Sequence, residues 1–325
     1  MASRRDVLLA LMTGGTATLH GRFAGMLSTV RQLGPTPVNF PVPARACDCH
    51  VHVFGDTKRF PFSPDRPYTP PPAAVDDLRR VHRRLHMERV VIINPAVYGT
   101  NNDCTVDAIR QLGPRARGIA LLAPEATASE LDRLRRAGIC GVRLNFETFG
   151  LTDPHAAVDR FQLAAKQVAE QGWHIQINTR LVIVEALERH ILRGSATVVF
   201  DHFAQAEPAL GIDQPGFAAL VRLLQSGRAY VKVSAAYRIS TQAPDYPDVA
   251  PLARALIAAN PERILWGSDW PHPDAVRRLG RRPTDVRPPL SVDDGRALNQ
   301  LAVWAPDATI RHRILVDNPA RLYGF

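Results

Sequence analysis

The sequence has few cysteines and no long apolar run. Four cysteines occur in 325 residues, and Cys47 and Cys49 stand two positions apart on one predicted strand, where a disulfide between them would distort the backbone. The four cysteines therefore do not predict a disulfide framework, and they leave the cellular compartment open. The composition is 46% hydrophobic and 22% charged, which is ordinary for a globular enzyme and excludes disordered, fibrous and many-pass membrane proteins.

Lysine is also scarce, so the net charge of +9 comes almost entirely from arginine. Only three of the 40 basic residues are lysines: Lys58, Lys166 and Lys232. Residues 1–46 hold five arginines against one aspartate, or +4, and the remaining charge is spread over helical patterns that predict solvated faces. No zinc-finger spacing, nucleotide-binding loop or helix-turn-helix occurs. We therefore expect no nucleic-acid partner, and the positive charge favours an acidic small molecule.

Residues 1–45 are predicted to form an N-terminal extension. Ser3-Arg4-Arg5-Asp6-Val7-Leu8 and the apolar run after it resemble a twin-arginine export signal, but no clean cleavage site follows. The run is too short to span a bilayer stably, so we expect no stable membrane anchoring. A frayed N-terminal helix of a cytoplasmic protein is the alternative, and periplasmic and cytoplasmic locations both stay open. Residues 31–45 form a Pro-rich connector.

Apolar strand-like runs alternate with amphipathic helical patterns from residue 46 to residue 325. The eight predicted strands are 46–54, 89–96, 118–123, 141–146, 174–179, 197–202, 229–235 and 264–269. Helical patterns follow them, at 73–87, 102–112, 128–137, 154–171, 181–193, 214–227, 247–260 and 291–304. This alternation predicts an α/β fold, a (β/α)8 or TIM barrel, with chemistry at the C-terminal ends of the strands. An open doubly wound sheet is disfavoured, because no Gly-rich phosphate turn follows the first strand.

Histidine and aspartate gather at three of these predicted strand ends. Alternation along the first strand places Asp48, His50 and His52 on one side. Two imidazoles about 6.6 Å apart along a strand can converge on one metal ion or one substrate oxygen. Burying both is costly unless each is paired, so a site is favoured over a core role. His202 and Asp269 end the sixth and eighth strands, where a barrel would bring them near the first.

Two arginines belong to apolar strand regions. Arg143 lies within the fourth predicted strand, and Arg238 follows the seventh. An arginine in such a position is either ion-paired within the protein or directed at an anionic ligand. The occurrence of two such residues favours the ligand slightly.

These residues and several short motifs resemble the amidohydrolase superfamily, amidohydrolase family 2. Asp48-x-His50-x-His52, His202 and Asp269 within the run WGSDWPHP carry the resemblance. The details are closer to the lactonase branch that includes 2-pyrone-4,6-dicarboxylate lactonase, as seen at residues 52–55, 60–64, 68, 99–102, 143–146, 201–202 and 318–323. The resemblance covers residues 44–325.

The resemblance implies a barrel hydrolase that opens an acidic lactone. It assigns Asp269 as the general base that activates water, and His50, His52 and His202 as the groups that polarise the lactone carbonyl. It assigns the binding of a carboxylated substrate to Arg143, Arg238, Tyr68, Asn178 and His272. Independent chemistry agrees, because a carboxylate can take the proton of water while cationic or hydrogen-bonding groups stabilise the oxyanion.

The metal-dependent members of the superfamily usually carry a histidine on the fifth strand, and this sequence matches that pattern incompletely. His174 stands at the beginning of the strand, so we expect it to face the wrong end of the barrel. The sequence therefore predicts that no metal or other cofactor is required. If a divalent metal such as zinc or manganese is bound, His50, His52 and Asp269 are the expected ligands.

The expected substrate is a small carboxylated lactone, but the sequence does not identify which one. The sequence does not predict the oligomeric state either. Ala96, Asn178 and the region of Phe149 stand where the pyrone lactonase has a serine, a tyrosine and a second arginine. A pyrone dicarboxylate, a muconolactone-type compound and a sugar-acid lactone are all candidates. A metal-dependent decarboxylase or amide hydrolase of the same superfamily and a non-catalytic binder of an acidic metabolite are the alternatives. A serine hydrolase is disfavoured because no Gly-x-Ser-x-Gly motif occurs.

Overall fold

Eight parallel strands form the centre of the protein in the computed structural model, which describes residues 35–275 and 280–325. They pair in chain order: β1 (Cys47–Val51), β2 (Arg89–Ile93), β3 (Ala116–Ala120), β4 (Ile139–Asn145), β5 (His174–Asn178), β6 (Val198–Phe200), β7 (Ala229–Lys232) and β8 (Ile264–Leu265). Most strands end earlier than the sequence predicts, because residues at their C-terminal ends leave the ladder and enter loops. The predicted twin-arginine segment lies outside the described residues.

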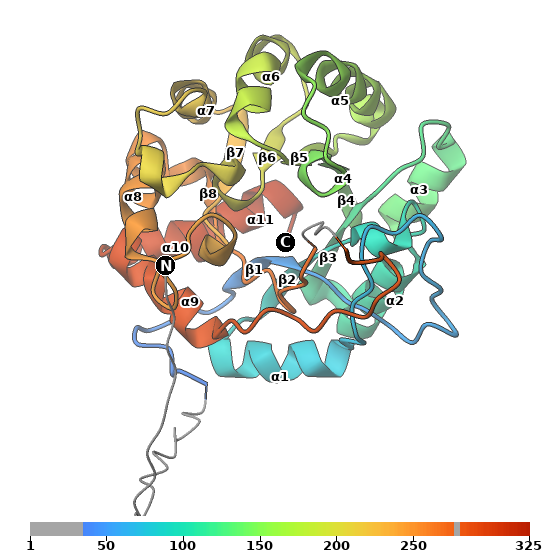
Figure 1. Cartoon of the computed structure of the whole chain (residues 1–325), viewed down its shortest axis with the longest axis horizontal. Coiled ribbons are helices and arrows are strands. Elements are labelled where there is room, and N and C mark those ends of the chain that lie inside the picture. The colour runs from blue at the N-terminus through green and yellow to red at the C-terminus, as the bar shows by residue number, and fades with distance from the viewer. Residues whose placement is uncertain (1–34, 276–279) are drawn as a thin grey trace, which may run out of the picture. The chain divides into compact units, whose positions relative to one another are not determined.

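The sheet closes into a barrel where β8 meets β1. The backbone N of Cys49 donates to the carbonyl of Trp266 at 3.0 Å, and that of Asp269 donates to the carbonyl of His50 at 2.8 Å. Closure leaves no unpaired edge on the sheet. The helices surround this ring of strands (Figure 1), which confirms the predicted (β/α)8 barrel.

The helices that cover the barrel agree closely with the helical patterns in the sequence. They are α1 (Val75–Leu85), α2 (Asp103–Leu112), α3 (Ala128–Arg136), α4 (Phe146–Phe149), α5 (Pro154–Val168), α6 (Leu181–Arg193), α7 (Phe217–Gln225), α8 (Ala250–Ala259), α9 (Asp294–Trp304), α10 (Ala308–His312) and α11 (Asn318–Tyr323). The Asp153 side chain caps α5, and Pro154 occupies the first helical position, where its missing N–H costs nothing. Every helix in the described ranges is too short or too polar to span a bilayer.

The Pro-rich segment at residues 35–45 contains no helix or strand but is attached to α9. Thr36 donates to Asp293 Oδ2 through its backbone N at 3.0 Å and through its hydroxyl at 2.7 Å. The backbone N of Asn39 donates to Asn299 Oδ1 at 2.9 Å. These contacts hold the segment against the start of α9.

A β-bulge in β1 changes which side chains face the barrel interior. Asp48 pairs with Val90, whereas Val51 pairs with Ile92, so β1 has one residue more than β2 over this stretch. The extra residue breaks the alternation, and Asp48 turns toward α1 while His50 turns inward. The expectation that Asp48 shares one face with the two histidines of the motif is therefore wrong.

The Asp48 carboxylate instead joins the two strands at which the barrel closes. Its Oδ1 accepts from the backbone N of His50 at 3.2 Å and of Ser268 at 2.9 Å. Its Oδ2 lies 3.3 Å from Nε2 of His82 on α1. Because Asp48 is fully buried, each of these contacts replaces water that the carboxylate has lost.

We expect Asp48→Asn to lower the free energy of unfolding by about 1–3 kcal/mol, because the new amide can place a donor against a backbone N–H donor. Chemical denaturation measures this change. Asp76→Asn is the matched control, since Asp76 is an exposed residue of α1 whose pair with Arg79 contributes little. Equal stability of the two variants would contradict the structural role of Asp48.

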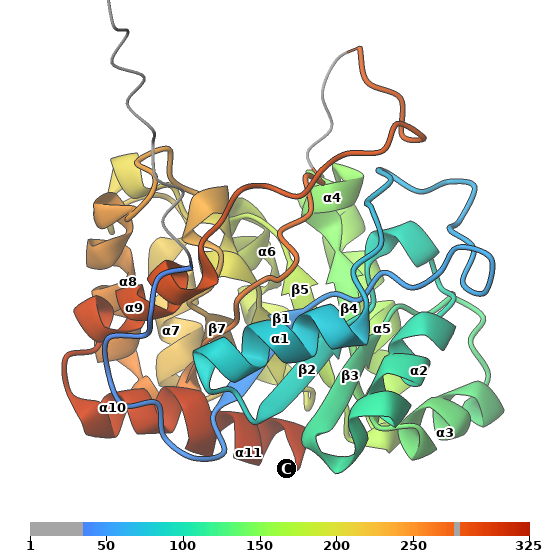
Figure 2. The same ribbon diagram turned by 90° about the horizontal axis from the view of Figure 1, so that it is seen from below.

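The opposite end of the barrel, where the strands begin, is covered by α11 (Figure 2). The side chain of Asn318 donates to the carbonyl of Ile264, the first residue of β8, at 2.8 Å. His174 begins β5 at this end, as the sequence predicts, and its ring packs edge-on against Tyr323 with centroids 5.4 Å apart. Burial lowers the pKa of His174 to about 3.

This buried histidine is expected to make the protein less stable in acid. Below pH 6.5 the unfolded chain protonates His174, while the folded chain does so only near pH 3, so the free energy of unfolding falls as the pH falls through this window. Between pH 7 and pH 4 the loss should be roughly 3 kcal/mol larger in the wild type than in His174→Asn. Urea unfolding at a series of pH values tests this, and parallel profiles would refute it.

Candidate active site

Polar side chains converge where the strands of the barrel end. His50 is the fourth residue of β1 and His52 follows that strand, while His202 follows β6 and Asp269 lies beyond β8. Asn178 is the last residue of β5. The structure therefore brings the four residues expected to act on the substrate together at the C-terminal end of the barrel, where barrel sites are built.

The backbone is constrained where these side chains leave the barrel. His202, Asp269 and His272 have φ values of 48°, 62° and 61°, in the left-handed region that side-chain-bearing residues rarely adopt. Such conformations cost about 1–3 kcal/mol each and persist only where the surroundings impose them. Gly267 allows the close approach of β8 to β1, because a Cβ there would lie 2.6 Å from that of His50.

Asp269 has a buried carboxylate whose two oxygens have different surroundings. Oδ2 accepts hydrogen bonds from the Tyr237 hydroxyl and from Arg238 Nε, both at 2.6 Å. Burial disfavours the ionised form, but the Arg238 guanidinium and the nearby histidines hold the pKa of Asp269 well below its usual range. The carboxylate is therefore ionised at neutral pH and fixed in orientation.

The second oxygen of Asp269, Oδ1, faces three imidazoles. It lies 3.6 Å from Nε2 of His50, 3.5 Å from Nε2 of His52 and 3.9 Å from Nε2 of His202. These distances exceed an ordinary hydrogen bond, and Oδ1 has no hydrogen-bond partner among the described residues. His202 is oriented by its Nδ1, which lies 2.9 Å from the Ser234 hydroxyl. The open oxygen keeps its capacity to bind a ligand.

A second, deeper layer of charge lies beneath the histidines. Lys232 of β7 is fully buried, and its Nζ donates to Gln176 Oε1 at 2.7 Å and lies 3.2 Å from His50 Nδ1. Asp201 Oδ1 lies 3.3 Å from the same Nζ, and Asp201 Oδ2 binds Arg143 Nε and Nη2 at 3.1 and 3.0 Å. Burial opposes ionisation of Asp201, yet Lys232 and its other cationic neighbours hold its pKa well below the usual range. The layer is a compact network in which one carboxylate pairs with two cationic side chains.

One hydrogen bond assigns the tautomer of His52. His52 Nδ1 lies 2.8 Å from the carbonyl of Ile93, which can only accept, so Nδ1 carries the proton and Nε2 a lone pair. Nδ1 of His50 lies 3.2 Å from both Lys232 Nζ, a donor, and Asp201 Oδ1, an acceptor, so these contacts leave two tautomers of His50 open. Burial lowers the pKa of His202 to about 4, and burial together with Lys232 lowers that of His50, so both rings are neutral at pH 7.

The same cluster fits a divalent metal ion in composition and spacing. Ligand atoms of His50, His202 and Asp269 lie within 4.8 Å of one another, and buried His50 Nε2 and Asp269 Oδ1 have no hydrogen-bond partner among the described residues. Nitrogen and carboxylate donors suit zinc or manganese. His202 takes the place that the sequence predicts for His52. Ligation through His50 Nε2 requires the proton of the ring to be on Nδ1, where Asp201 Oδ1 at 3.2 Å can accept a hydrogen bond from it.

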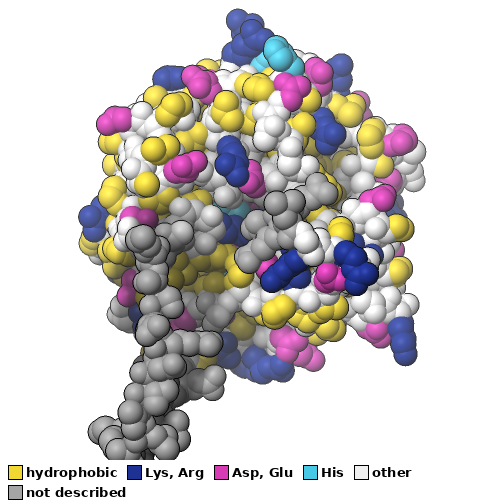
Figure 3. Space-filling model, in the orientation of Figure 1, with side chains coloured by type: hydrophobic (Ala, Val, Ile, Leu, Met, Phe, Trp, Pro, Cys, Tyr) yellow, Lys and Arg dark blue, Asp and Glu magenta, His cyan; other side chains and the backbone are white. Residues whose placement is uncertain are grey.

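A cavity of about 580 Å³ lies beside this cluster, because Tyr237 and Arg238, which hold Asp269, line it, whereas Asp269 and the three histidines do not. Its lining comes from the loops after several strands and comprises Glu147, Thr148, Gly150, Asn178, Arg180, Gln205, Tyr237, Arg238, Asp274, Ala275 and Leu290. Arg180 binds Glu147 through two parallel contacts of 2.8 and 2.7 Å. Figure 3 shows acidic and basic side chains interspersed on the face that it views. The cavity has the size of a metabolite site.

The two strand arginines are both ion-paired within the protein. Arg143 binds Asp201, and Arg238 binds Asp269. The sequence left an ion pair and an anionic ligand as alternatives, and the contacts show the ion pair in each case. Arg238 also lines the cavity, and a guanidinium has five N–H donors, so its pairing with Asp269 leaves donors that can reach a ligand.

The other expected substrate-binding residues lie in different positions. Asn178 lines the cavity. Tyr68 is buried, which raises the pKa of its hydroxyl, and the charge of Asp269 acts on it. His272 lies behind the cavity wall, because its Nε2 is 3.0 Å from Asp294 Oδ1 and its ring packs edge-on against Tyr237 with centroids 5.6 Å apart.

Several residues of the site were not predicted. Lys232, Gln176 and Asp201 form the deeper layer, Tyr237 orients Asp269, and Arg180 lines the cavity. Lys232 and Gln176 could have been found, since each is a polar residue inside an otherwise apolar strand. Tyr237 and Arg180 lie in loops, where strand periodicity gives no signal.

Comparisons with known proteins agree on one family. Residues 47–325 match the family model described as Amidohydrolase. The chain is 37% identical to a 4-sulfomuconolactone hydrolase from Rhizobium radiobacter, over 89% of this chain and 93% of that protein. It is 34% identical to a 2-pyrone-4,6-dicarboxylate hydrolase from Comamonas testosteroni, with the same coverage of 89% and 93%. The fold is similar to the crystal structure of a probable 2-pyrone-4,6-dicarboxylic acid hydrolase from Acinetobacter baumannii with citric acid bound. The TM-score is 0.72 and the identity 26%, over 86% of this chain and 100% of that one. The chain belongs to the amidohydrolase family.

Proposed function

We propose that the protein hydrolyses a small carboxylated lactone, with Asp269 as the general base for the attacking water. The observation that carries the proposal is the ionised Asp269 carboxylate, held on one oxygen by Arg238 and Tyr237 and open on the other toward three imidazoles. The similar proteins support it, because they are named for hydrolysis of 4-sulfomuconolactone and 2-pyrone-4,6-dicarboxylate. Both of those lactones bear acidic groups.

The reaction follows from the two sides of the Asp269 carboxylate. A water bound at Oδ1 gives its proton to Asp269 as its oxygen adds to the acyl carbon of the lactone. The carbonyl oxygen becomes an oxyanion, and the bond between the acyl carbon and the ring oxygen then breaks. Protonated Asp269 returns the proton to the departing ring oxygen. The product is the open-chain acid, and Asp269 is restored as a carboxylate.

The three histidines have different roles in the proposed reaction. We assign His50 the Nε2–H tautomer in this reaction, in which Nδ1 accepts from Lys232 and Nε2–H donates to the developing oxyanion. His52 presents a lone pair on Nε2, so it accepts the second hydrogen of the water and orients it. His202 completes the ring of imidazoles around Oδ1. Neutral imidazoles act here by fixed hydrogen bonds, which cost no reorganisation during the reaction.

The acidic group of the substrate is proposed to bind in the cavity beside Asp269. Arg238 and Asn178 line this cavity, and Tyr68 lies near Arg238. Of the other two residues that the resemblance implies, Arg143 pairs with Asp201 and His272 contacts Asp294, and neither lines the cavity. Arg180 adds a second guanidinium to the lining, although Glu147 shares its charge. This arrangement favours a lactone with one strongly anchored anionic group.

We propose that no metal is required for this reaction. A zinc or manganese ion bound by His50, His202 and Asp269 would supply Lewis-acid polarisation of the carbonyl. The position of Lys232 supports the metal-free reaction, because its Nζ lies 3.2 Å from Nδ1 of His50 and places a positive charge beside a ring that would have to bind a cation. The alternative is a metal-dependent decarboxylase or amide hydrolase, and measurement of the metal content distinguishes it from a metal-free lactonase.

Asp269→Asn is expected to lower kcat by about 10²–10⁴-fold, because the amide cannot take the proton of water. The assay is acid release with a pH indicator on pyrone dicarboxylate, muconolactone-type and sugar-acid lactones. Asp159→Asn, an exposed change on α5, is the matched control. Full activity of the Asp269 variant would remove it as the base. Binding of a lactone by the wild type without acid release would favour the non-catalytic binder.

Removal of divalent metal is expected to leave the hydrolysis rate unchanged. The protein is dialysed against a chelator, its metal content is measured by elemental analysis, and the rate is compared before and after addition of zinc or manganese. The rate should not depend on metal, because Asp269 and the imidazoles supply the base and the hydrogen-bond donor. Stoichiometric metal, with activity lost on removal and restored on addition, would overturn the metal-free mechanism.

A further inference from the structure

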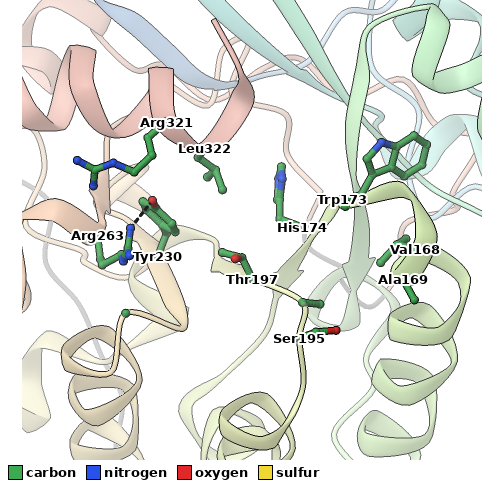
Figure 4. A pocket seen from close by; sticks show the side chains of 13 residues that line it. Val168, Ala169, Trp173, His174, Ser195, Thr197, Tyr230, Arg263, Arg321 and Leu322 are labelled. Carbon is green, nitrogen blue, oxygen red and sulfur yellow. Dashed lines mark hydrogen bonds between the residues drawn. The ribbon is translucent and has the colours of Figure 1, made fainter.

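A second cavity opens at the end of the barrel where the strands begin (Figure 4). It has a volume of about 500 Å³ and lies between α11 and the starts of the strands, with His174, Tyr230 and Arg321 among its lining residues. We call it the N-terminal cavity. His174 and Asn178 stand at opposite ends of β5, about 13 Å apart by the rise of a strand. The N-terminal cavity is therefore separate from the cavity beside Asp269, and the two share no lining residue.

The lining of the N-terminal cavity is basic and rich in hydrogen-bond donors. Arg263 and Arg321 contribute guanidinium groups, and Ser195 and Thr197 contribute hydroxyl groups. Among the described residues that line it, none is aspartate or glutamate. Glu262 lies nearby, with Oε2 3.4 Å from Arg321 Nη1, but both side chains are about half exposed, so this pair is weak. The chemistry of the lining matches an oxyanion.

Two polar atoms in this lining are buried without a partner. His174 Nε2 and Arg263 Nε have no hydrogen-bond partner among the described residues, and only 3% of the His174 surface is exposed. Native proteins rarely leave such atoms unsatisfied, because each has lost its hydrogen bonds to water. The lining therefore holds polar groups on two elements whose hydrogen bonds the protein itself does not supply.

The Arg263 guanidinium is already held in position. Its Nη1 donates to the Tyr230 hydroxyl at 2.5 Å, and its central carbon lies 4.8 Å from the centre of the Tyr230 ring. Figure 4 shows Arg263 and Tyr230 on one side of the cavity and His174 on the other. A donor fixed before binding loses little conformational freedom when a ligand arrives.

We propose that the N-terminal cavity is a second binding site, for the carboxylate or phosphate group of a small metabolite. Arg263 and Arg321 provide the charge, and His174, Ser195 and Thr197 provide further hydrogen-bonding groups. The volume admits a molecule of metabolite size. The proposal does not depend on the reaction at Asp269, because none of these residues contacts the groups of that site.

Trp173 lines the N-terminal cavity and supplies a local reporter of binding. Inorganic phosphate and malate are titrated separately into the full-length protein, and tryptophan fluorescence and calorimetry are recorded. We expect saturable binding of at least one probe, with affinity reduced about tenfold or more in Arg263→Gln and in Arg321→Gln, since each loses a charge-assisted contact. Trp173→Phe should lose the fluorescence change and keep the calorimetric signal.

Two control variants locate the binding. Arg135→Gln removes one half-exposed arginine of α3 outside the cavity and should bind like the wild type. Asp269→Asn should also retain binding. If the binding signal is lost in Asp269→Asn and kept in Arg263→Gln, the probe binds in the cavity beside Asp269 and the proposal is wrong. Arg321 is 49% exposed, so its variant tests the site even if Arg263→Gln does not fold.

The two probes distinguish the sources of the oxyanion. Binding of phosphate alone would identify a phosphorylated ligand, and binding of malate alone a carboxylate. Binding of both would indicate a site for oxyanions of either kind. Failure of both probes to bind would refute the proposal. Lactone hydrolysis without added anion should be unchanged in Arg321→Gln, which separates this test from that of the proposed function.

Discussion

One buried carboxylate, Asp201, organises the interior of the barrel. It pairs with Lys232 from β7 and Arg143 from β4, and it lies 3.2 Å from the Nδ1 atom of His50 on β1. Charges in an apolar interior persist only when their partners are close and fixed, because an unpaired buried charge is very costly. The strands that carry these residues must therefore keep their register, and the place of His50 follows from the same contacts.

His50 links this deeper layer to the layer that faces the cavity. Its Nδ1 contacts Lys232 and Asp201, and its Nε2 faces Asp269. The ring is therefore held between the two layers, with Nε2 on the side where the proposed oxyanion would form. In this member of the amidohydrolase family, the buried charges of Lys232 and Asp201 orient the imidazole that is proposed to act on the lactone.

The arginine-rich composition has a similar explanation in the structure. The two strand arginines neutralise buried carboxylates, many others form ion pairs on helices, and Arg263 and Arg321 line the N-terminal cavity. Guanidinium groups stay charged and bind carboxylates through fixed geometry, so they suit each of these environments better than lysine. The one buried lysine, Lys232, occupies the place where a compact donor is needed between three acceptors.

The order of strands and helices, the barrel and the convergence of His50, His52, His202 and Asp269 could be predicted from sequence. They follow from local periodicity and from the rule that parallel strands end at one face. The direction of Asp48, the ion pairs of Arg143 and Arg238, and the contacts of Tyr237 could not. A single-residue bulge reverses strand alternation without changing composition, and a buried charge finds its partner only when distant strands are packed together. The sequence by itself determined which side chains reach the end of the barrel; tertiary structure decided which of them are neutralised within the protein and which stay open to a ligand.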